Sequence, residues 1–156
     1  MNFPSLTSKD LNDRKLNLPD DLSGQINLLF IAYQQWQQRE VDSWVPFAQE
    51  LEATVPGLSY YELPVVGPMG FWGRTQLDFW MRTGITDFKT RSKTITLYVD
   101  RDLVKRPLGI DTEDHIAIVL LDENNQAIWR DHSMFDIQKA KSLRQVIAQH
   151  TTINTT

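Results

Sequence analysis

The feature that most constrains the fold is the run 26–33, in which seven of eight residues are apolar. A strand with apolar side chains on both faces must be covered on both faces, because each side chain has to be removed from water. We therefore predict a central strand here, in a sheet with layers on both sides. A Pro-, Asp- and Gly-containing turn, Leu18–Gly24, precedes it.

The rest of the chain alternates between helical and strand patterns. Apolar residues recur every three or four positions from Val41 to Val55, which predicts a helix that Pro56 and Gly57 end. Two apolar runs, 116–121 and 127–129, flank the polar turn 122–126 and predict a β-hairpin. The remaining predicted elements are strands at 58–66, 94–99, 116–121 and 127–129, and helices at 72–83, 103–106 and 137–147.

Length and charge restrict the class of protein. A chain of 156 residues suits a single domain. Sixteen basic and twenty acidic residues give a net charge of −4, which argues against nucleic acid as a partner. The apolar runs are shorter than the ~20 residues of a membrane-spanning helix, and Met1–Asp10 lacks the pattern of a secretory signal, so we expect a cytoplasmic protein without a membrane span.

We divide the chain into three parts. Residues 1–17 show no sustained period and are expected to form an N-terminal arm or a frayed strand. Residues 18–150 make the domain, and the polar residues 151–156 are expected to form a disordered tail.

The absence of cysteine excludes whole classes of chemistry. Thiolate nucleophiles, disulfide exchange, zinc–thiolate sites and iron–sulfur clusters all require it. His115, His132 and His150 are far apart in sequence and show no metal-ligand spacing, so no metal and no cofactor are expected. Asp131 and His132 precede Ser133, but neighbours on a strand point to opposite faces, so no catalytic triad and no catalytic residue is assigned.

The order of elements, together with Leu18–Gly24 before the first strand and 119–130 in the hairpin, resembles the thioredoxin-like and peroxiredoxin-like superfamily. The resemblance covers residues 18–150. It implies an α/β, thioredoxin-like fold with a central mixed β-sheet flanked by helices and a helical insertion. Gln38–Trp44 and Ile128–Arg130 are similar to the mitochondrial ATP synthase assembly factor family and its bacterial relatives, which implies a role in the assembly of a membrane complex.

The sequence departs from the superfamily at its reactive loop. Where thioredoxins have Cys-x-x-Cys, this chain has Tyr33–Arg39, and the segment 112–115, where they place a cis-proline, contains no proline. Thiol peroxidase and disulfide oxidoreductase activity are therefore excluded. The residues that replace the loop either bind a polar ligand or a peptide backbone through their amides, or form an inert relic: Gln34, Gln35, Gln37, Gln38, Arg39 and His115.

A second candidate surface lies in the insertion. Its aromatic and arginine side chains are of the types enriched at protein interfaces, although helical spacing equally suits aromatics that pack on the sheet. The predicted contact residues are Phe71, Trp72, Arg74, Trp80 and Arg82. Eight basic and four acidic residues between Arg74 and Arg106 add a modest basic face, which is either a binding surface or simply solvated.

These observations predict a redox-inactive thioredoxin-like binding module. Its partner is expected to be another protein, for which it acts as an assembly factor or adaptor. The alternative is an enzyme that uses the pocket between 34–39 and 112–115 for chemistry without a thiol. The oligomeric state is left open.

Overall fold

The computed structural model describes residues 1–10, 12, 14–66 and 92–154. Its main sheet has the strand order β4-β3-β6-β7. The central strand β3 (Ile26–Ala32) pairs in parallel with β4 (Leu58–Pro64) and antiparallel with β6 (Ala117–Leu121). An edge strand, β7 (Ala127–His132), pairs antiparallel with β6. The predicted mixed sheet is therefore confirmed.

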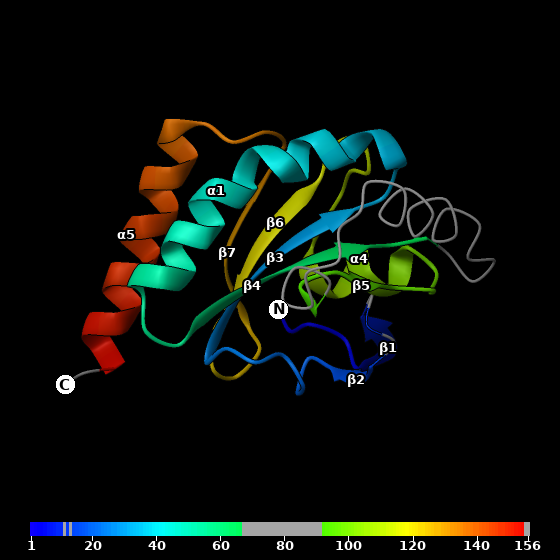
Figure 1. Cartoon of the computed structure of the whole chain (residues 1–156), viewed down its shortest axis with the longest axis horizontal. Helices are drawn as coiled ribbons and strands as arrows, with labels where there is room; N and C mark the ends of the chain where they lie inside the picture. Colours follow the sequence, from blue (N-terminus) through cyan, green and yellow to red (C-terminus); the bar gives the residue numbers. More distant parts are fainter. Residues whose placement is uncertain (11, 13, 67–91, 155–156) are drawn as a thin grey trace.

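Every residue of β3 is buried, as its apolar pattern predicts. Leu28, Phe30 and Ala32 contribute to one core, and the alternating Leu29 and Ile31 contribute to the other. Figure 1 shows the two layers that cover these cores, with α1 and α5 on one face of the sheet and α4, β1 and β2 on the opposite side.

The first core is closed by two long helices. Helix α1 (Gln38–Thr54) buries an apolar stripe that includes Val41, Trp44 and Leu51. The helix ends before Pro56 and Gly57, and Gly57 has a φ of 80°. Helix α5 (Ile137–Asn154) packs Ala140, Leu143 and Ile147 into the same core. The predicted domain boundary at residue 150 thus falls inside α5.

The second core is covered by a short helix and the N-terminal segment. Helix α4 (Asp102–Leu108) is followed by Gly109, whose φ of 66° ends the helix in the left-handed region. Strands β1 (Leu6–Asp10) and β2 (Lys15–Leu18) form a hairpin, and β1 also pairs with β5 (Ile95–Thr96). Two parallel bridges join this small sheet to the main one, from Glu62 in β4 to Thr94 and from Val65, just after β4, to Leu97.

The β6–β7 turn forms as the sequence predicts. The Asp122 carboxylate accepts hydrogen bonds from the backbone N–H groups of Asn124 and Gln126, and Asn125 adopts a φ of 62°. The predicted helix at 72–83 lies outside the described residues. None of the helices among the residues described is long and apolar enough to cross a membrane.

The segment before β1 is held against the domain. The Phe3 side chain is 4% exposed in the second core, and its N–H donates to the Asn125 carbonyl at 3.1 Å. We expect Phe3→Ala to lower the free energy of unfolding by about 3 kcal/mol, because it opens a cavity in that core. Urea denaturation of both proteins measures this.

The matched control is Leu103→Ala, which removes an exposed apolar side chain from α4. It should change the free energy of unfolding by less than about 0.5 kcal/mol. Equal small effects of the two substitutions would show that the N-terminal segment does not contribute to the core.

Candidate functional site

Three segments meet at the carboxyl end of β3: the short helix η1 (Gln35–Gln37) with its N-cap Gln34, the first turn of α1, and the loop 112–115 before β6. We call this region the pole. The pole contains all six residues predicted as the relic active-site loop.

Gln37 fixes the backbone of the pole. Its side chain is fully buried, and its amide oxygen accepts hydrogen bonds from the backbone N–H groups of Tyr33, at 2.8 Å, and Gln34, at 3.3 Å. Its amide nitrogen donates to the Glu113 carbonyl at 2.7 Å. One side chain therefore ties the end of β3 to the loop 112–115.

Other polar side chains of the pole face solvent. Gln34, Gln35 and Arg39 are exposed, and Trp36 is 44% exposed. The Trp36 indole N–H donates to the Gln34 side-chain oxygen at 3.0 Å, and the Arg39 guanidinium lies 5.9 Å from the indole centroid. These contacts hold a large aromatic side chain in a defined position at the surface.

Beneath the surface lies Glu40, which the sequence analysis did not select. It is only 2% exposed, and its carboxylate faces three donors from distant segments. His115 Nδ1 lies 2.8 Å from Oε2, the Ile116 N–H donates to Oε1 at 3.1 Å, and the Ser133 hydroxyl donates to Oε2 at 3.3 Å. One feature of the sequence indicates that Glu40 is buried. It lies one residue before Val41, on the face of α1 that continues with Trp44 and Leu51.

His115 is the partner of Glu40 that reaches the surface. Its side chain is 45% exposed, and its ring lies edge-on to Trp36 with 6.2 Å between centroids. The one cis peptide bond in the described part of the chain precedes Pro19, so the segment before His115 lacks the cis bond of thioredoxins.

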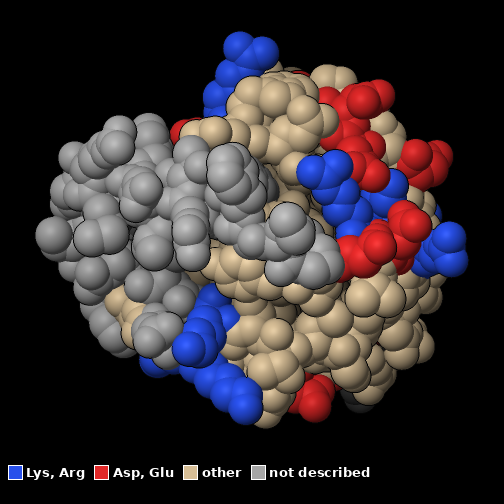
Figure 2. Space-filling view, turned by 90° about the vertical axis from the view of Figure 1, so that its right-hand side faces the viewer, with Lys and Arg blue, Asp and Glu red and all other residues tan. Residues whose placement is uncertain are grey.

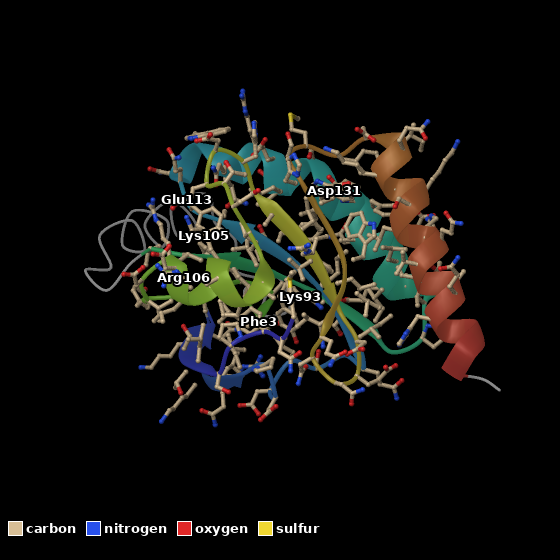
Figure 3. The ribbon with its side chains drawn as sticks, turned by 180° about the vertical axis from the view of Figure 1, so that it is seen from behind. Phe3, Lys93, Lys105, Arg106, Glu113 and Asp131 are labelled. Carbon is tan, nitrogen blue, oxygen red and sulfur yellow. The ribbon has the colours of Figure 1, made fainter. Side chains whose placement is uncertain are left out.

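A groove of about 540 Å³ runs beside His115. It lies between the segment 109–112 and the strands β6 and β7, and polar residues on its walls include Thr112, Asp131 and His132. The Arg130 guanidinium forms part of its wall and donates to the carbonyls of Leu108 and Gly109 at 2.6 and 3.0 Å. Figure 3 shows Asp131 on β7, on the opposite side of β6 from Lys105 and Glu113.

The predicted basic face is neutralised in its described part. Arg101 and Lys105 both pair with Glu113 at 2.5 Å, and the hydrogen bond from Lys105 is the main reason that the pKa of Glu113 is lowered. Arg106 lies 3.6 Å from Asp102. Figure 2 shows acidic and basic side chains intermixed on this side of the molecule, which favours a solvated surface over a binding site for anions.

The predicted contact residues of the insertion lie outside the described residues: Phe71, Trp72, Arg74, Trp80 and Arg82. Among the residues described, no cluster of three or more His, Asp or Glu side chains is arranged to hold a metal ion.

Gln38 connects the pole to a second buried acid. Its amide nitrogen donates to Glu62 Oε1 at 3.0 Å and to Asp42 Oδ1 at 2.9 Å. Burial raises the pKa of Glu62 from 4.5 to about 7, and the nearby Asp42 charge acts in the same direction. Glu62 therefore changes its charge near neutral pH inside the fold.

This pKa shift predicts how stability varies with pH. Below about pH 4.5 Glu62 is protonated in both states, whereas between 4.5 and 7 the unfolded chain loses the proton and the folded chain keeps it. The contribution of Glu62 to stability is therefore lost as the pH rises through 7. Relative to the parent, Glu62→Gln should gain up to about 3 kcal/mol in unfolding free energy between pH 4.5 and 8.

Urea denaturation across this pH range measures the difference. Glu50→Gln, which removes an exposed carboxylate from α1, is the control and should show a nearly constant difference from the parent. A constant difference for Glu62→Gln as well would contradict the raised pKa.

Comparison with known proteins shows the fold. No protein-family model matches the chain, and no curated protein matches it. Solved structures do match. The exposed lipoprotein thioredoxin of Streptococcus pneumoniae has 13% sequence identity and a TM-score of 0.59, and the match covers 93% of this chain and 98% of that one.

Two further structures match at similar levels. The thioredoxin domain of a thiol-disulfide oxidoreductase from Bacteroides vulgatus has 14% identity and a TM-score of 0.64, covering 94% of this chain and 96% of that one. BsSco, a member of the Sco family of cytochrome c oxidase assembly proteins, has 12% identity and a TM-score of 0.63. The match covers 97% of this chain and 95% of that one. The chain therefore has a thioredoxin-like fold, and it carries no cysteine.

Proposed function

We propose that this chain is a thioredoxin-like binding module that holds a protein partner at the pole without thiol chemistry. The observation that carries the proposal is the exposed Trp36, which is held beside His115 over a network that Gln37 and Glu40 fix from below. Thioredoxins carry their reactive loop at the end of the strand that corresponds to β3. We propose that, in this chain, the exposed side chains at the end of β3 serve as contact groups instead of a reactive loop.

The exposed groups suit a protein partner. Tryptophan and arginine are enriched among residues that dominate binding energy, and Trp36 and Arg39 stand next to each other at the surface. The Gln34 amide adds groups that can pair with a peptide backbone. Because Gln37 already orders the backbone below, binding costs little conformational entropy at this position.

The finer proposal is a role as an adaptor or assembly factor. Its support is the sequence resemblance to an assembly factor family and the fold shared with BsSco, whose own family assembles cytochrome c oxidase. Phe71, Trp72, Arg74, Trp80 and Arg82 are proposed from the sequence as a second contact region for the same partner.

A second candidate function is an enzyme that works without a thiol in the groove beside His115, which differs from the predicted pocket because no residue of 34–39 lines it. One observation favours it, namely that His115 lines the groove with a buried carboxylate behind it. The groove is lined by His115 and not by Arg39, so the chemistry would depend on the histidine.

Site-specific photo-crosslinking in the native cells tests partner binding. A photoreactive amino acid replaces Trp36 in one protein and Ile137, an exposed apolar residue at the start of α5, in the control. We expect Trp36, and not Ile137, to capture a reproducible partner. The same capture from both positions, or none from Trp36, would contradict binding at the pole.

The affinity of the captured partner then separates the two contact regions. Trp36→Ala should weaken binding by about 2 kcal/mol, as expected for a dominant aromatic contact. Trp72→Ala with Trp80→Ala tests the insertion in the same assay. An unchanged affinity for Trp36→Ala would remove the pole from the contact, even if the insertion variant binds weakly.

A further inference from the structure

We propose that Glu40 and His115 form a carboxylate–imidazole dyad that hydrolyses esters bound in the groove, with His115 as general base and water as nucleophile. The inference extends the second candidate function and is independent of partner binding. It rests on the hydrogen bonds around Glu40, on the exposure of His115 and on the groove beside it.

The hydrogen bond to Glu40 determines which ring nitrogen is available. An ionised carboxylate oxygen only accepts, so we assign the hydrogen to His115 Nδ1, which lies 2.8 Å from Glu40 Oε2. In the neutral ring Nε2 then keeps its lone pair. This is the arrangement in which a carboxylate orients an imidazole as a base and stabilises the imidazolium that forms.

Glu40 is itself held in place. Its other oxygen accepts from the Ile116 N–H, and the Ser133 hydroxyl donates to the oxygen that His115 uses. Ser133 has a φ of 72°, a left-handed conformation that is uncommon for a residue with a side chain. The bond from the Trp44 indole to the Ser133 carbonyl, at 3.0 Å, fixes this strained turn. Glu40 thus acts as a positioning residue with little freedom to rotate.

The base is accessible to a substrate. The His115 side chain is 45% exposed and lines the groove of about 540 Å³, which is large enough for a small ester. Trp36 limits the movement of the ring from the outer side. Thr112 also lines the groove, and its hydroxyl oxygen accepts from the Asp114 N–H at 3.1 Å, so its own hydrogen can be donated to a substrate carbonyl.

The other histidines lack this combination. His132 Nδ1 lies 3.8 Å from the Asp131 carboxylate, which is beyond hydrogen-bond distance. His150 is paired with Glu123 through Nε2 at 2.8 Å, but the Glu123 side chain is 42% exposed. His115 alone among the three combines a buried carboxylate with a groove.

The proposed reaction is balanced without a cofactor. His115 Nε2 takes a proton from water as the water oxygen forms a bond to the ester carbonyl carbon. The bond from that carbon to the alcohol oxygen then breaks, and Nε2 returns the proton to the leaving oxygen. The products are a carboxylic acid and an alcohol.

Hydrolysis of p-nitrophenyl acetate by the full chain at about pH 8, where ordinary imidazole is neutral, tests the proposal. We expect the release of p-nitrophenolate to fall at least about tenfold in His115→Ala and in Glu40→Gln. His150→Ala, the control, should leave the rate unchanged. A fall of less than about threefold in His115→Ala would overturn the proposal.

The tautomer of His115 in the parent protein gives a readout that does not depend on variants. Long-range ¹⁵N–¹H correlation spectra should show the hydrogen on Nδ1 and none on Nε2 in the neutral ring, and Glu40→Gln should change this pattern. Hydrogen on Nε2 in the parent would overturn the dyad. Neither result affects crosslinking at Trp36, so failure of the dyad and failure of partner binding are distinguishable.

Discussion

The structure of the pole depends on one buried carboxylate. Glu40 lies in the first turn of α1 and accepts hydrogen bonds from His115 and Ile116, which precede β6, and from Ser133, which follows β7. A buried carboxylate without donors is strongly unfavourable, and so are buried donors without an acceptor. The first turn of α1, the residues before β6 and Ser133 must therefore come together in one arrangement, and His115 lies at the surface in it.

The double-layered core makes this possible. Because β3 buries side chains on both faces, the end of the strand is held from both sides, by α1 against Phe30 and by the second core against Ile31. The Trp44 ring packs against Phe30 with 6.0 Å between the ring centroids, and its indole N–H donates to the Ser133 carbonyl. The hydrophobic core and the polar site are therefore parts of the same packing arrangement.

The sequence predicted those features that depend on local periodicity. Strand β3, helix α1 and the hairpin turn at Asp122 follow from spacing and from turn chemistry, and all three are found. The role of Glu40 could not be predicted, because its partners His115 and Ser133 are 75 and 93 residues away along the chain. The pairing of β1 with β5 is also nonlocal, so no period marks it.

Amide hydrogen exchange at Ile116 tests most directly whether Glu40 organises the site. Its N–H donates to Glu40 Oε1 from a fully buried residue. We expect slow exchange in the parent and much faster exchange in Glu40→Ala, while the amide of Leu29 in the central strand reports any global loss of stability. Exchange at Ile116 that is rapid in the parent, or that changes only as much as at Leu29, would contradict this role of Glu40.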